Sequence, residues 1–231
     1  MALFSSIFGK AKQPPAPNQI REALFGDMPI EQWPPANSVS KEFPWSLFET
    51  ARSNVATGNQ EAAVDCWRQI IQRPNLESRQ YLQAWHFLRH NGQQPPPEVA
   101  KQVLGVVIEV GMPNGLDLLA AYPDHFARYY NFSGAGVIWE HPDGSLDSAI
   151  DQLLAASKVI VDKIGPWDQP RPIPPPRDQA RLNFLTPSGL HFGQAPMAVL
   201  ARDPMAGRVL QLATVLMQAL IAKTDKSKPS A

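Results

Sequence analysis

The chain has 231 residues, a hydrophobic fraction of 44% and equal numbers of basic and acidic residues, 21 of each. Balanced charge creates no net field toward nucleic acid or an acidic membrane surface, so neither is predicted as a partner. The single cysteine, Cys66, excludes an internal disulfide and is typical of a reducing compartment, so we expect a cytoplasmic protein. No stretch of sequence approaches the roughly 20 apolar residues that a membrane-spanning helix needs.

Residues 1–44 are predicted to form an N-terminal arm rich in proline, which excludes long helices there. The arm also contains Trp33 and Phe43, followed by Trp45, and these are too apolar for a solvated linker. We therefore expect part of the arm to lie against the folded body. A short helix at the start of the arm would place four apolar side chains on one face, which leaves contact with a membrane or a partner open beside a packed terminus. These side chains are Leu3, Phe4, Ile7 and Phe8.

Residues 45–94 show apolar residues at helical spacing and predict three helices, which end near Gly58, Pro74 and Gly92. Four residues match the small, small, small and aromatic positions of a tetratricopeptide-type repeat, namely Ala51, Gly58, Ala63 and Trp67. Gly92 follows Gly58 by one period of 34 residues. The segment therefore resembles such a repeat, although Asn54 stands where the repeat has an aromatic residue. Because a solenoid needs three or more repeats, we expect a helical hairpin plus one further helix.

Residues 95–97 are three prolines and mark the predicted boundary to an α+β domain over residues 95–223. A short helix is expected to begin at Pro97 and Glu98. The apolar spacing then changes, and residues 103–110, 116–122, 126–132 and 136–140 predict four strands of an antiparallel meander. Because residues 103–110 are almost entirely apolar, that strand is expected to be covered on both faces.

The rest of the domain repeats the order of hairpin and helix. The meander ends in one hairpin and is followed by a helix over residues 145–164, and a second hairpin over residues 180–193 precedes a long apolar helix that begins near Asp203. Gly136 and Gly189 coincide when the hairpins are aligned, so both are expected at positive φ, and a ββα–ββα duplication is open. The predicted fold class is α+β, with two helices packed on one face of the sheet and a disordered tail over residues 224–231.

Signatures of catalysis, of metal binding and of a cofactor site are missing from the sequence, so no catalytic residue, metal or cofactor is predicted. His86 and His90 lie one helical turn apart, as zinc ligands often do, but no third ligand follows at a metal spacing, which favours a structural role. A polar set recurs on the two hairpins and is the predicted ligand-binding candidate. It comprises Arg128, Tyr130, Asn131, Arg181, Asn183 and His191. Arg128 and Arg181 would face a common anion if the hairpins meet in one sheet; the alternative is a solvated sheet face.

The last helix has apolar residues around most of its circumference and only a narrow polar stripe. Its outer surface therefore needs a cover, which either the arm or a second copy of the chain would supply. The residues predicted to form this interface are Met205, Val209, Leu212, Leu216 and Ile221. From these features we expect a non-enzymatic interaction or assembly protein that associates as a homodimer. The alternative is a small anionic-ligand-binding or enzymatic domain that uses the faces of Arg128 and Arg181.

Overall fold

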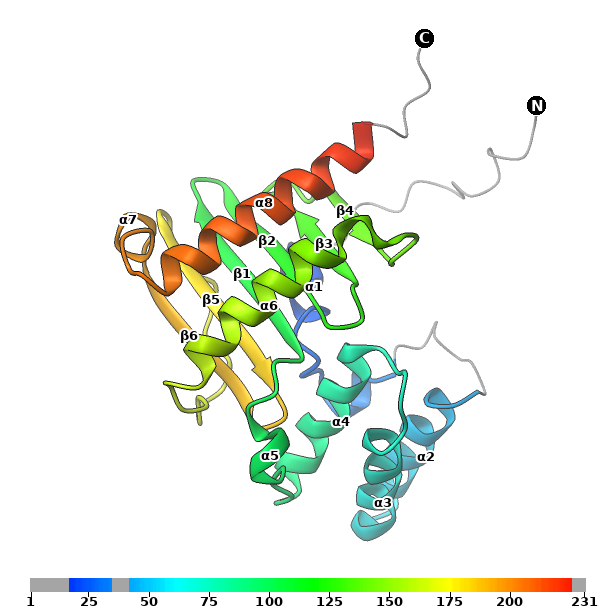
Figure 1. Ribbon diagram of the computed structural model, residues 1–231. Helices are drawn as coiled ribbons and strands as arrows, with labels where there is room; N and C mark the ends of the chain where they lie inside the picture. Colours follow the sequence, from blue (N-terminus) through cyan, green and yellow to red (C-terminus); the bar gives the residue numbers. More distant parts are fainter. Residues whose placement is uncertain (1–16, 35–41, 226–231) are drawn as a thin grey trace, which may run out of the picture.

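The computed structural model describes residues 17–34 and 42–225 (Figure 1). A six-stranded antiparallel sheet, in the order β4-β3-β2-β1-β5-β6, lies between helices on both of its faces. This arrangement confirms the predicted α+β class and the antiparallel sheet. The residues predicted to form an apolar face at the start of the arm, Leu3, Phe4, Ile7 and Phe8, lie outside the described residues, as do residues 226–231 of the predicted tail.

The strands follow the predicted order. They are β1 (Gly105–Met112), β2 (Gly115–Ala121), β3 (Ala127–Tyr130), β4 (Gly136–Trp139), β5 (Gln179–Thr186) and β6 (Gly189–Pro196). The first four form the expected meander, and β5 then pairs with β1 on the other side. The two hairpins, β3–β4 and β5–β6, therefore lie at opposite edges of one sheet, with β1 and β2 between them.

The longer helices also occur where the apolar spacing places them. Before the sheet come α1 (Pro17–Glu22), α2 (Trp45–Ala56), α3 (Gln60–Ile71), α4 (Ser78–His90) and α5 (Pro97–Ala100), with a 3-10 turn over Ile30–Gln32. A second 3-10 turn, Gly144–Leu146, leads into α6 (Asp147–Val161), and α7 (Met197–Leu200) precedes α8 (Ala206–Asp225). The sequence did not predict α7. None of the helices in the described ranges combines the length and the apolar character needed to cross a membrane.

One face of the sheet is covered by α6 and α8, as predicted (Figure 1). Three of the five residues predicted for a dimer interface, Val209, Leu212 and Leu216, are buried in this layer. Met205 is half-buried, and Ile221 is 39% exposed. The sheet and α6 thus cover more of α8 than its sequence suggested, because α8 also lies against α6. Self-association stays a prediction.

The opposite face of the sheet is covered by α1, the turn that follows it, and α4. Leu24 and Leu82 pack in one apolar cluster with Val107 and Leu118 of the central strands. The hydroxyl of buried Tyr122 donates to the carbonyl of Leu24 at 2.6 Å. Residues from the arm, the helical segment and the sheet therefore share one core, and a cut at residues 95–97 would uncover this face.

The helical segment has the side-by-side packing that its resemblance to a tetratricopeptide-type repeat implies, with α3 in contact with both α2 and α4. Ala51, Ala63 and Trp67 are buried in its core. Gly58 and Gly92 end their helices at φ values of 79° and 71°, which glycine adopts without a steric penalty. Trp33 of the arm is also buried here, where its ring lies 5.4 Å from that of Trp45.

The two hairpin turns differ in detail. Gly189 has the predicted positive φ, 124°, whereas Gly136 does not; in the first turn the left-handed residue is Gly134, at 85°. The first turn closes earlier than the alignment assumed, because Gly134 donates its amide to the carbonyl of Asn131. Gly136 is restricted by space instead, since a Cβ there would lie 2.3 Å from Cδ1 of Tyr130 and 2.5 Å from the carbonyl oxygen of Tyr129.

Candidate functional site

A buried carboxylate organises the sheet face beneath α1. Glu109 of β1 is fully buried, and it accepts from Arg21 Nε at 2.5 Å, from Arg181 Nη1 at 3.2 Å and from Asn183 Nδ2 at 3.0 Å. Arg21 comes from α1, whereas the other two donors lie on β5. Because a buried charge is costly unless it is paired, these contacts hold the arm on the sheet.

The proline-rich connector over residues 165–178 closes this network from above. The carbonyl oxygen of Pro172 accepts from Arg21 at 2.8 Å and from Arg181 at 3.2 Å, and that of Ile173 accepts from Arg181 at 2.7 Å. Burial lowers the pKa of Arg181, and Glu109 partly offsets this effect. Arg181 also donates to the side chain of Gln194. Its guanidinium is therefore hydrogen-bonded to β1, β6 and the connector, which is a structural role in the fold.

The six polar candidates do not form one site. Arg128 lies on the same face as Arg181, but β1 and β2 separate them, so the two guanidinium groups do not face a common anion. Tyr130 packs in the apolar cluster under α4, and Asn131 accepts from Ser133 within its own turn. His191 pairs with Phe184 and therefore points to the other face. Asn183 bonds to Glu109 and to the carbonyl of Val107.

His191 is fully buried and takes part in the one serine–histidine contact found among the described residues. Its Nε2 lies 3.1 Å from Ser188 Oγ, and burial, with Lys101 nearby, lowers its pKa. In a hydrolytic triad a carboxylate would orient the imidazole. Within the described ranges no carboxylate contacts His191, and a hydrogen bond to the backbone of Ile164 partly offsets the effect of burial on its pKa. The pair therefore lacks the carboxylate that completes such a triad among the described residues.

A cavity of about 700 Å³ lies between α4, the start of the connector and the β5–β6 turn. Its walls combine apolar side chains with several basic groups. Phe25, Leu82, Leu185 and Leu190 supply apolar surface, and His86, Arg89, His90 and Arg171 supply the basic groups. Asp27, Asp168, Thr186 and Ser188 also line it. The cavity thus draws on the arm, the helical segment and the sheet domain together.

Arg89 is the least compensated charge in this wall. Its Nη1 donates to the carbonyl oxygen of Pro187 at 2.6 Å, and no carboxylate of the described residues forms an ion pair with it. Burial lowers the pKa of Arg89 to about 10, which the more distant Asp27 only partly offsets. A desolvated guanidinium retains several donors in a fork that matches carboxylate and phosphate groups.

Arg171 is held more firmly in the same wall. Its Nε donates to Asp27 Oδ2 at 2.7 Å, its Nη2 also contacts Glu22, and its Cζ lies 4.1 Å from the ring centre of Phe25. Burial opposes the charge of Arg171, but Asp27 and Glu22 outweigh it, so its pKa is raised. Its Nη1 is buried and has no hydrogen-bond partner among the described residues.

His86 contributes a neutral imidazole to the cavity. Burial lowers its pKa to about 3, and the charges of His90, Arg89 and Arg171 add to the effect. The rings of His86 and His90 are 4.3 Å apart, and His90 Nδ1 contacts the carbonyl of His86 at 2.9 Å. Within the described ranges no third ligand completes a metal set with this pair. Three positive or potentially positive groups therefore act on one imidazole in the cavity wall and favour its neutral form.

The arrangement can hold a molecule with an anionic head and an apolar body. Trp167, one of the residues that line the cavity, is 42% exposed and packs against the ring of Phe192. No protein-family model, no curated protein and no solved structure matches the chain. Sequence reasoning missed Arg89 and Arg171; the one available signal was the cluster of His86, Arg89 and His90 at the end of a predicted helix.

Proposed function

We propose that the chain binds a small organic anion in the cavity between α4, the connector and the β5–β6 turn. The observation that carries the proposal is Arg89, a half-buried guanidinium in the cavity wall that has a carbonyl oxygen as its partner and no carboxylate of the described residues. An anion would supply the missing counter-charge. A charge-assisted pair in such a desolvated place is stronger than one at the surface.

The size and the walls of the cavity narrow the class of ligand. A volume of about 700 Å³ lies within the range of roughly 300–1,000 Å³ that is usual for pockets of small molecules and cofactors. Phe25, Leu82 and Leu190 would contact an apolar or ring-shaped body, while Arg89 binds a carboxylate or a phosphate. The anion-binding function predicted as an alternative is thus proposed here with Arg89 and Arg171 in place of Arg128 and Arg181.

The proposal is tested by measuring melting temperatures with a panel of anions, namely inorganic phosphate, adenosine monophosphate, succinate and citrate. A ligand present at about 100 times its Kd stabilises the folded state by about 2.7 kcal/mol. For a protein of this size that corresponds to a rise of about 5–10 °C in Tm. We expect at least one organic anion to produce such a rise and to bind in calorimetry with one site per chain.

Two variants decide whether the cavity is responsible. Arg89→Gln should remove the rise in Tm, whereas Arg208→Gln should keep it, because Arg208 lies on the exposed side of α8. Circular dichroism of both variants controls for folding. If no anion raises the Tm of the parent chain, or if Arg89→Gln responds as the parent does, the proposal is wrong.

Self-association, the function first predicted, is a second candidate with less support. Val209, Leu212 and Leu216 already pack inside the chain, and of the five predicted interface residues only Ile221 is classed as exposed. Val215, 50% exposed, adds one apolar side chain on the outer side of α8. Sedimentation at micromolar concentration tests it, and a monomer whose Tm does not change on dilution would exclude it.

A further inference from the structure

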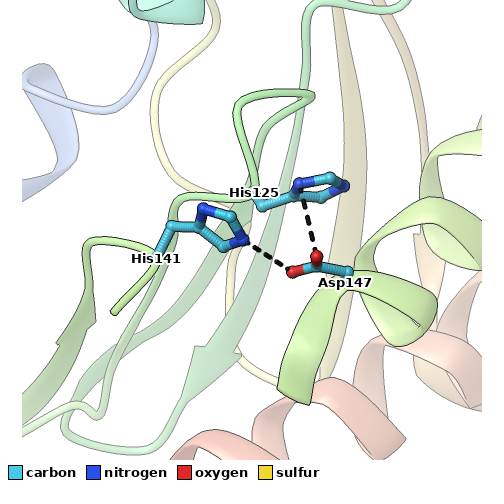
Figure 2. A group of neighbouring side chains, drawn as sticks. All are labelled: His125, His141 and Asp147. Carbon is cyan, nitrogen blue, oxygen red and sulfur yellow. Dashed lines mark hydrogen bonds and ion pairs between the residues drawn. The ribbon is translucent and has the colours of Figure 1, made fainter. Parts of the chain in front are cut away.

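We propose that His125, His141 and Asp147 bind one divalent transition-metal ion at the N-terminal end of α6. Figure 2 shows the two imidazole rings turned toward the carboxylate of Asp147. His125 comes from the β2–β3 turn, His141 from the loop after β4, and Asp147 from the first residue of α6. The cavity described above adjoins the connector that follows the other end of α6, so the two sites are separate.

The spacing of the candidate ligand atoms suits a small ion. His141 Nε2 lies 3.0 Å from Asp147 Oδ1, His125 Nδ1 lies 3.8 Å from Asp147 Oδ2, and one ligand atom from each residue falls within 4.8 Å of the others. In a tetrahedral zinc site with bonds of about 2.0–2.1 Å, the ligand atoms are about 3.3 Å apart. Small side-chain rotations would bring the three groups to that spacing.

The second nitrogen of His125 points to the same conclusion. Its Nε2 lies 3.0 Å from Asp151 Oδ1, one turn further along α6. A proton on Nε2, donated to this carboxylate, leaves Nδ1 as a free lone pair directed toward Asp147. Carboxylate–histidine–metal arrangements of this kind fix the tautomer and the orientation of metal ligands. Asp151 is therefore assigned as the positioning residue of the site.

Backbone conformation sets these histidines apart from their surroundings. His125 and His141 have φ values of 61° and 51°, in the left-handed region that residues with a side chain seldom adopt. Such conformations cost free energy and are concentrated at functional sites. Here both lie in the turns that bring the two rings together. Side-chain exposures of 26% for His125 and 37% for His141 leave the site open to solvent, so water would fill the remaining coordination positions.

The donor set selects the class of ion. Two imidazoles favour zinc, cobalt, nickel or copper over magnesium and calcium, which prefer oxygen ligands throughout. The carboxylates of Asp147 and Asp151 supply negative charge that neutralises the ion and offsets the partial positive charge of the N-terminal amides of α6. We therefore expect Zn²⁺ and Co²⁺ to bind and Mg²⁺ not to compete.

The test uses the full chain without a histidine tag, treated with a chelator and then titrated with Co²⁺ and Zn²⁺. We expect one ion per chain in calorimetry and visible absorption bands of bound Co²⁺ that Zn²⁺ abolishes. His141→Gln should weaken binding at least 10-fold, and Asp151→Asn by about 10–100-fold, the usual effect of removing an outer-shell partner. His90→Gln is the matched control, because it removes an exposed histidine that is likewise adjacent to another histidine ring.

Each outcome decides the proposal. Loss of binding in His141→Gln and Asp151→Asn, with unchanged binding in His90→Gln, would support it. Absence of saturable binding in the parent chain, or equal affinity in the parent and His141→Gln, would overturn it and leave the cluster as histidine–aspartate ion pairs. A rise in Tm with Zn²⁺ that is lost in His141→Gln provides a second readout. The result is independent of anion binding, which depends on Arg89.

Discussion

Replacing Glu109 with glutamine should strongly destabilise the protein while preserving the shape of the side chain. The carboxylate is fully buried, and it is the only acidic group of the described residues that contacts both Arg21 and Arg181, whose side chains are 6% and 3% exposed. The amide would carry no charge and would direct N–H groups at a guanidinium. Removing one member of a buried ion network typically costs about 3–5 kcal/mol, because the remaining charges stay buried without a partner.

The size of the effect can be read from thermal and urea denaturation. For a chain of this length each kcal/mol shifts Tm by about 2–4 °C, so Glu109→Gln should lower Tm by roughly 6–20 °C. Glu140→Gln removes an exposed carboxylate and serves as the control, with a change in unfolding free energy below about 0.5 kcal/mol.

A double-mutant cycle with Arg21→Gln tests the assignment of the partner. The single variant Arg21→Gln should cost less than Glu109→Gln, because Glu109 would keep Arg181 and Asn183. The double variant should be more stable than the sum of the single losses predicts, by about 0.5–3 kcal/mol. A Glu109→Gln chain within 1 kcal/mol of the parent, or strictly additive losses, would refute the reasoning that a charge network holds the arm on the sheet.

Acid should destabilise the protein through His86. The pKa of this residue is 6.5 in the unfolded chain and about 3 in the folded state. Between these pH values the unfolded state binds more protons than the folded state, so the folded state loses stability as the pH falls. When the pH falls from about 7 to about 4.5, His86 should lower the free energy of unfolding by about 2 kcal/mol. In the variant His86→Gln, stability in urea denaturation should therefore depend less on pH. Gly111→Ala should lower the free energy of unfolding by about 1–3 kcal/mol, because the new Cβ would lie 2.1 Å from the carbonyl oxygen of Pro176. Gly193→Ala is the control and should leave the stability nearly unchanged, because no atom lies within 4 Å of the position of its Cβ. Equal denaturation midpoints for the two glycine variants would contradict this account of the connector.

The sequence by itself determined the local elements and their order. Alternating and helical apolar spacing located the strands and the long helices, since burial of one face imposes the period of each element. Gly58 and Gly92 marked helix ends for a local reason, because a left-handed residue there favours glycine. The hairpin turns were located in the same way, and only the residue at positive φ in the first turn was misplaced.

The candidate sites depended on contacts that no local pattern encodes. Glu109 is the lone charge of an apolar strand and was not singled out from the sequence, because its partners, Arg21 and Arg181, lie 88 and 72 residues away in the chain. The predicted anion site failed for a similar reason, because Arg128 and Arg181 share a sheet face and yet two strands separate them.

Tertiary packing also brought together the residues of the cavity around Arg89 and those of the proposed metal site, His125, His141 and Asp147. Each draws its groups from segments whose sequences show no common motif, since ligand-binding geometry depends on where turns and helix ends meet in space. The sequence constrains which groups must be buried or exposed. Which of those groups become neighbours is decided only by the order of the strands in the sheet and by the path of the connector, residues 165–178, over it.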